Sequence, residues 1–79
     1  MVNEKEFYEK LGLKIREMRE EKGFKPINAL CSKLVDYGLD LSDSMFGKYE
    51  LGSRHISVYR LALLAKSLDT TIDELIPKN

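Results

Sequence analysis

The stretch that decides the fold is LSDSMFGKYELG, residues 41–52. At the helical period of 3.6 residues, Met45, Phe46 and Tyr49 fall on one face. Ser42 is placed to cap the start of this helix, and the closing glycine can end it in a left-handed conformation. The opposite face carries small, polar or charged residues. The pattern therefore predicts a short helix with a narrow apolar anchor and a wide polar front.

Apolar residues recur at helical spacing on both sides of this stretch as well. Asn3, Ser57 and Thr71 are placed to cap three further helices, and Pro26 suits the first position of another. We therefore expect five short helices and no strand. The apolar stripes expected on the first, second and fourth helices are Phe7, Leu11, Ile15 and Met18, then Ile27, Leu30, Cys31, Leu34 and Val35, and then Val58, Leu61, Ala62, Leu64, Ala65 and Leu68. Leu75 and Ile76 follow the cap of the short fifth helix.

The composition predicts one small cytoplasmic domain spanning residues 1–79. Thirteen basic and thirteen acidic residues cancel, so the total charge gives no argument for nucleic acid. The single cysteine cannot form an internal disulfide, which favours a reducing compartment. No run approaches the roughly 20 apolar residues that a membrane span needs, and no signal peptide is recognisable. We expect no membrane partner.

The order of these signals resembles the Cro/cI-type helix-turn-helix family, also called the lambda-repressor-like or XRE family. The resemblance covers roughly residues 11–76. It implies a compact all-α bundle of five helices whose second and third helices form a DNA-reading unit. The matching pieces are Ile15–Gly23, Leu30-Cys31, Leu41–Gly52, Leu61–Leu68 and Thr71–Leu75.

The family places its base-reading side chains near the start and middle of the third helix. The resemblance therefore implies this role for Asp43, Ser44, Gly47 and Lys48. Lys48 can donate to guanine, Ser44 to a base or a phosphate, and Asp43 can accept from cytosine. Asp43 can alternatively only reinforce the helix N-terminus, and Gly47 would let the helix approach closely. The alternative for the whole face is a plain surface helix.

The resemblance also implies contacts to phosphates. Lys25 and Asn28 stand near the start of the second helix, where the family commonly has Thr-Gln or Ser-Gln. Arg54 and His55 fall in the loop after the third helix, which passes beside the DNA backbone in this fold. Arg60 is either a contact at the rim or a solvated charge, and solvation is the expectation.

A further pair implied by the family joins Arg19, near the end of the first helix, to Glu50, at the end of the third. This pair would act as a structural clamp. Whether it also aims Arg19 at a phosphate is left open by the sequence.

One departure from the family concerns the connection between the second and third helices. The segment from Gly23 to Glu50 is about six residues longer than is usual for the family, and most of the excess lies within Val35–Leu39. The sequence leaves open whether these residues extend the second helix or form a loop.

Enzyme chemistry finds no support in the sequence. There is no Gly-rich phosphate loop and no nucleophile with a base at meaningful spacing. Cys31 lies on an apolar stripe, which predicts a buried thiol in the core. His55 is the only histidine, so a metal site is not expected either. We expect no catalytic residue, cofactor, metal or small-molecule substrate.

The sequence thus predicts a sequence-specific DNA-binding transcriptional regulator, a repressor in the manner of phage and prokaryotic regulators. By the family's habit it would bind double-stranded DNA as a homodimer, on half-sites about 34 Å apart. Ile72, Leu75 and Ile76 are the expected dimer contacts. The alternative is a protein-interaction module of the antitoxin or anti-repressor type, which uses the same surface with little or no DNA binding.

Overall fold

The longest helix, α1 (Glu4–Glu21), spans 18 residues. The computed structural model describes residues 3–78, so residues 1, 2 and 79 of the predicted domain lie outside it. The Asn3 side chain caps α1 by accepting a hydrogen bond from the Glu6 backbone N–H at 2.8 Å. Leu11 and Ile15 of the predicted stripe are buried.

The second helix, α2 (Ile27–Val35), begins one residue after the position expected from the sequence. Pro26 has an extended backbone and occupies the cap instead of the first helical turn. Leu30 and Leu34 are fully buried. Val35 is 57 % exposed, contrary to expectation, because it is the last residue of the helix and is followed by the exposed turn of residues 36–38.

The long connection between α2 and α3 is a loop and not an extension of α2. Residues 36–38 form a turn, after which the Leu39 N–H donates to the Leu34 carbonyl at 3.0 Å. The chain then runs without regular structure to Ser42. Leu39 and Leu41 are buried, so the extra residues are tied to the core by two apolar side chains.

The central stretch forms α3 (Asp43–Leu51) as the sequence predicts. The Ser42 hydroxyl accepts a hydrogen bond from the Met45 N–H at 3.1 Å. Gly52 ends the helix with a φ of 76°, in the left-handed region. Phe46 and Tyr49 of the predicted anchor are buried, whereas Met45 is only half-buried.

The last two helices are α4 (Val58–Ser67) and α5 (Ile72–Leu75), capped by Ser57 and Thr71 as predicted. Val58 is 77 % exposed and not part of the core, because the first turn of α4 projects beyond it. The rest of the α4 stripe lies inward, including the buried Leu61, Leu64 and Ala65.

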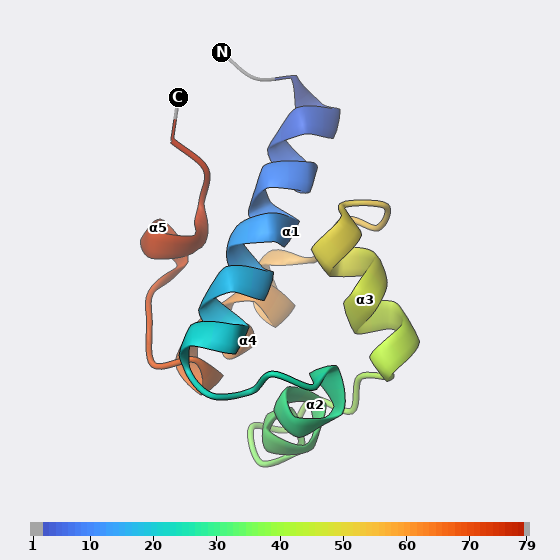
Figure 1. The fold of residues 1–79 in the computed structure, drawn as a ribbon, viewed down its shortest axis with the longest axis vertical. Coiled ribbons are helices and arrows are strands. Elements are labelled where there is room, and N and C mark those ends of the chain that lie inside the picture. The colour runs from blue at the N-terminus through green and yellow to red at the C-terminus, as the bar shows by residue number, and fades with distance from the viewer. Residues whose placement is uncertain (1–2, 79) are drawn as a thin grey trace.

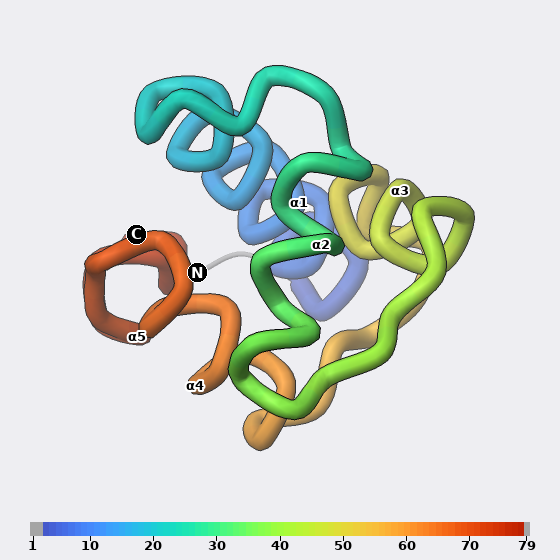
Figure 2. The backbone as a smooth tube through the Cα atoms, turned by 90° about the horizontal axis from the view of Figure 1, so that it is seen from below, coloured from blue at the N-terminus to red at the C-terminus, as the bar shows by residue number. Residues whose placement is uncertain are grey.

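The five helices of residues 3–78, with no strand among them, form the predicted all-α domain. Figure 1 shows α3 and α5 on opposite sides of α1, with α4 behind it and α2 across one end. The view from below in Figure 2 places α2 in front of α1, between α3 and α5. No helix in this part of the chain is both long and apolar enough to cross a membrane.

The closest packing joins α1 to α3, in a contact that we call the α1–α3 seam and that centres on Gly12, Arg19, Glu50 and Gly52. A Cβ atom on Gly12 would overlap the Glu50 carbonyl oxygen. A Cβ atom on Gly52 would lie 2.7 Å from the backbone nitrogen of Glu9. Both positions therefore need glycine, because a side chain there would force the two helices apart.

Candidate nucleic-acid interface

The polar front of α3 lies at the surface, as the sequence predicts. Asp43, Ser44 and Lys48 are exposed, whereas Gly47 is half-buried, and a Cβ atom on it would lie 4.0 Å from the Ile27 side chain. Leu51, which the sequence pattern does not single out, is 73 % exposed. Because Leu51 follows Ser44 by seven residues, it shares the same face of the helix. The front is therefore a polar strip that ends in an exposed leucine.

The start of α2 lies at the surface too. Lys25 and Asn28 are exposed, and α2 packs directly against α3. The two consecutive helices and the loop between them form one unit, seen side by side in Figure 2. The structure thus leaves these two predicted phosphate contacts free to meet a partner of α3.

The predicted partners Arg19 and Glu50 form a buried ion pair. Arg19 Nε donates to Glu50 Oε2 at 2.6 Å, and Nη2 donates to Oε1 at 3.2 Å. Nη1 donates to the carbonyl oxygens of Phe24, at 2.8 Å, and Lys25. The guanidinium therefore joins α1, the chain before α2 and the end of α3 through a paired and hydrogen-bonded charge.

Burial decides the question that the sequence left open about Arg19. Only 3 % of Arg19 is exposed, so it offers no surface to a DNA phosphate. Of the two alternatives for Arg19, the structure therefore contains the clamp with Glu50, and the burial of Arg19 gives no support to a contact with phosphate.

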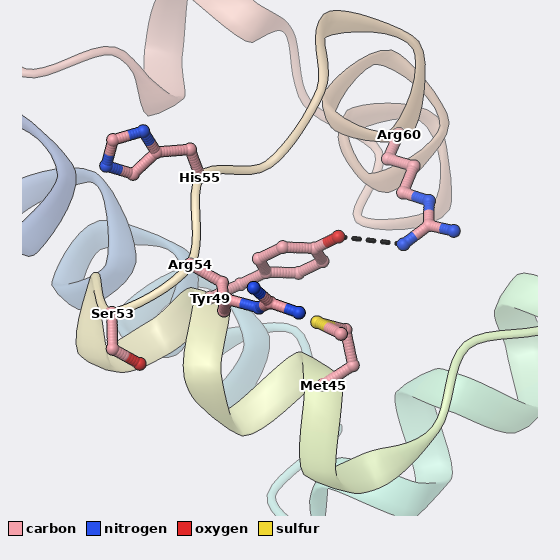
Figure 3. Close-up of a pocket in the computed structure, with 6 residues that line it drawn as sticks. All are labelled: Met45, Tyr49, Ser53, Arg54, His55 and Arg60. Carbon is pink, nitrogen blue, oxygen red and sulfur yellow. Dashed lines mark hydrogen bonds between the residues drawn. The ribbon is translucent and has the colours of Figure 1, made fainter.

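Beside α3 lies a hollow of about 560 Å³, which we call the arginine hollow (Figure 3). Arg60 reaches into it from α4, and its Nη1 donates to the Tyr49 hydroxyl oxygen at 2.8 Å. The expectation that Arg60 is simply solvated is therefore wrong, since a buried tyrosine holds it. The residues that line the hollow are Met45, Tyr49, Ser53, Arg54, His55 and Arg60.

The two predicted contacts in the loop after α3 lie differently. Arg54 extends past the ring of Tyr49, whereas the His55 ring points the other way (Figure 3). The His55 imidazole stacks on Tyr8 of α1, with centroids 3.8 Å apart and an angle of 7° between the planes. Both loop residues are exposed. Sequence spacing cannot reveal this stack, because Tyr8 and His55 are far apart in the chain.

The predicted dimer contacts need a correction. Leu75 is completely buried in the core of its own chain, so it cannot touch a second copy. Ile72 and Ile76 are half-buried and pack against that core. The helix α5 has only four residues, and Leu75 is the one that it buries. This side chain therefore holds α5 to its own domain.

Cys31 lies in the core, as the sequence predicts. Burial, followed by the nearby Asp43 carboxylate, raises the pKa of its thiol to about 12. A thiol with so high a pKa is neutral at physiological pH and a poor nucleophile or metal ligand. Among residues 3–78, no three histidine, cysteine or acidic side chains gather in a way that could hold a metal ion.

Two short helices in succession, the second with an exposed polar front, define a helix-turn-helix domain. The structure is similar to the crystal structure of the DNA-binding domain of BldD, with a TM-score of 0.78 and 31 % sequence identity. The match covers 98 % of this chain and 100 % of that chain. No protein-family model and no curated protein sequence matches the chain. At this identity and coverage, the chain belongs to the same helix-turn-helix family as the BldD domain.

Proposed function

We propose that this chain is a sequence-specific DNA-binding regulator of transcription, of the Cro/cI type. The observation that carries the proposal is the exposed front of α3, on a fold shared over its full length with a DNA-binding domain. The major groove of B-DNA is about 12 Å wide and admits one α-helix. An exposed helix backed by a rigid seam is suited to enter it.

In this proposal the front of α3 meets the edges of the bases. Lys48 donates to guanine O6 or N7, and Ser44 donates to a base or a phosphate. Asp43 stands in the first turn, where its charge also suits the helix dipole. Lys25, Asn28 and Arg54 meet phosphates, and these contacts fix the position of α3 without reading sequence.

We further propose a repressor that acts as a homodimer. A two-fold pair of such domains would place its two α3 helices on half-sites about 34 Å apart. The half-buried Ile72 and Ile76 are the remaining candidates from the predicted contact, since Leu75 is enclosed. Blocking a promoter needs only such occupancy of the operator.

The experiment that tests the function is the selection of bound duplexes from a random DNA pool at two salt concentrations. We expect an enriched palindromic site whose binding weakens steeply with salt, because each phosphate contact releases counterions. The double variant Lys48→Ala/Arg54→Ala should lose the enrichment. The matched control is Arg16→Ala/Lys66→Ala, which removes the same charge from exposed positions on α1 and α4. No enrichment at low salt would refute DNA binding.

A specific observation favours a second candidate function, in which the same surface binds a protein. Leu51 is 73 % exposed at the end of the front. It borders a hollow of about 580 Å³ between α1 and α3, which Leu13 and Ile27 also line. An apolar contact there would be insensitive to salt. A partner whose binding is lost in Leu51→Ala, from a chain that enriches no DNA site, would establish this alternative.

A further inference from the structure

We propose that the arginine hollow binds a phosphate group, with Arg60 as its main ligand, Arg54 as its second and Tyr49 as the residue that positions Arg60. The proposal rests on the function proposed above, in which the phosphate belongs to the DNA backbone beside the bases that α3 reads. It assigns a binding role to Arg60 and a positioning role to Tyr49.

The charge of the hollow points to an anion. Arg54 and Arg60 are its charged residues, and none of the described residues that line it carries a carboxylate. Within residues 3–78, no ion pair includes Arg54 or Arg60, although Arg16, Arg19 and Lys78 all have acidic partners. Two guanidinium groups that share one hollow repel each other, and an anion between them removes this cost.

The hydrogen bond to Tyr49 prepares Arg60 for this role. Tyr49 is 7 % exposed, and its ring is anchored in the core, so its hydroxyl is a fixed acceptor at 2.8 Å from Arg60 Nη1. That contact engages one nitrogen of the guanidinium and leaves the others free to donate. A planar group held in this way loses little entropy when it binds phosphate with two hydrogen bonds.

The position of the hollow fits a phosphate next to the bases that α3 reads. Met45 and Tyr49 line it, and on a helix they lie about 60° and 100° around the axis from Lys48. The hollow therefore borders the front on the side of Lys48. A strand whose base edge meets Lys48 would pass its backbone along this side, where Arg54 and Arg60 lie (Figure 3).

The first test measures DNA affinity against salt for Arg60→Gln, Tyr49→Phe and the control Lys66→Gln, which removes an exposed charge from the same helix. Arg60→Gln should lower affinity about tenfold and reduce the slope of log K against log salt by about 0.9, the value for one phosphate contact. Tyr49→Phe keeps the charge, so it should lower affinity about threefold with an unchanged slope. An Arg60→Gln variant that behaves like the control would overturn the assignment to the DNA backbone.

The second test needs no DNA and separates this inference from the proposed function. Inorganic phosphate is titrated into the full chain at constant ionic strength, and the side-chain Nε–Hε NMR signals of its arginines are followed. The signals of Arg54 and Arg60 should shift, that of Arg16 should not, and Arg60→Gln should abolish the shift of Arg54. Shifts in a chain that binds no duplex would keep the hollow as a free-anion site and reject the DNA function. If no signal shifts and the DNA variants have no effect, the inference is wrong.

Discussion

The two sides of α3 differ in packing: the side that faces α1 is tightly packed, and the front is exposed to solvent. On the α1–α3 seam, Gly12 and Gly52 bring backbones into direct contact, and a buried ion pair closes one end. On the front, Ser44 and Lys48 are exposed. Larger side chains do not fit in the seam, whereas substitutions of the exposed residues on the front remove little packing. Substitutions should therefore separate into those that unfold the domain and those that change only what it binds.

The largest effect is expected at the ion pair of the seam. Arg19→Ala should lower the free energy of unfolding by about 3–5 kcal/mol, because it leaves the Glu50 carboxylate buried without its partner. Chemical denaturation measures this loss. Arg16→Ala is the control, since Arg16 pairs with Glu20 at 3.8 Å with 59 % of its side chain exposed, and it should cost less than about 0.5 kcal/mol.

A double-mutant cycle shows whether Arg19 and Glu50 act as one unit. The variant Arg19→Ala/Glu50→Ala should lose less stability than the sum of the two single variants, because neither charge is then left alone. Strictly additive losses would show that the two side chains do not interact in solution.

Burial in the core should also protect Cys31 of α2. At neutral pH, a thiol whose pKa is raised to about 12 from 9.0 holds about a thousandfold less thiolate than a free one. Alkylation of the native chain should be slower than that of the denatured chain by at least this factor. Stability should also fall as the pH rises from 9.0 toward 12, because the unfolded thiol ionises first, and Cys31→Ala should lack this part of the fall. Equal alkylation rates would mean that α2 opens freely.

A pair of glycine variants compares the seam with the front directly. Gly12→Ala should cost about 3 kcal/mol, because the new methyl group would meet backbone atoms that cannot move aside. Gly47→Ala should instead stabilise the domain by about 0.5–1 kcal/mol, because alanine favours the helix and its nearest neighbour would be 4.0 Å away. Thermal and denaturant unfolding distinguish the two. Similar effects at both positions would contradict the contrast between the two sides of α3.

The smallest effect on stability is expected on the front. Lys48→Ala should leave the unfolding free energy nearly unchanged but weaken binding to the selected DNA site by about 1–3 kcal/mol. Preference for the base that it reads should relax at that position. Unchanged specificity would remove Lys48 from the base-reading residues and favour the protein-binding alternative.

The sequence was sufficient for the features that depend on neighbouring residues. The caps at Asn3, Ser42, Ser57 and Thr71 each accept from the N–H group three residues later, so a single sequence shows them. The resemblance supplied one longer-range contact, between Arg19 and Glu50, which the structure contains. Periodicity failed at Val35 and Val58, because it places a residue on a face but does not say where the core ends.

Apart from the exposed Leu51, the missed parts of the site join segments that are distant in the chain. In the sequence, Gly12 is only a residue of low helix propensity within α1. The structure shows that it is needed because the backbone carbonyls of α3 lie against it. Arg60 looks solvated until the hydroxyl of Tyr49, eleven residues earlier, is placed beside it. These contacts come from the packing of whole helices, and no local pattern in a single sequence encodes them.

The stack of His55 on Tyr8 gives this chain a built-in reporter. The two rings lie nearly parallel at 3.8 Å, so the ring current of the tyrosine should move the imidazole protons upfield. His55 is the only histidine, so its proton signals can be recognised without isotopic labelling. Any ligand that displaces the loop after α3 from α1 would return these signals to ordinary positions. A one-dimensional proton spectrum would then follow the loop directly.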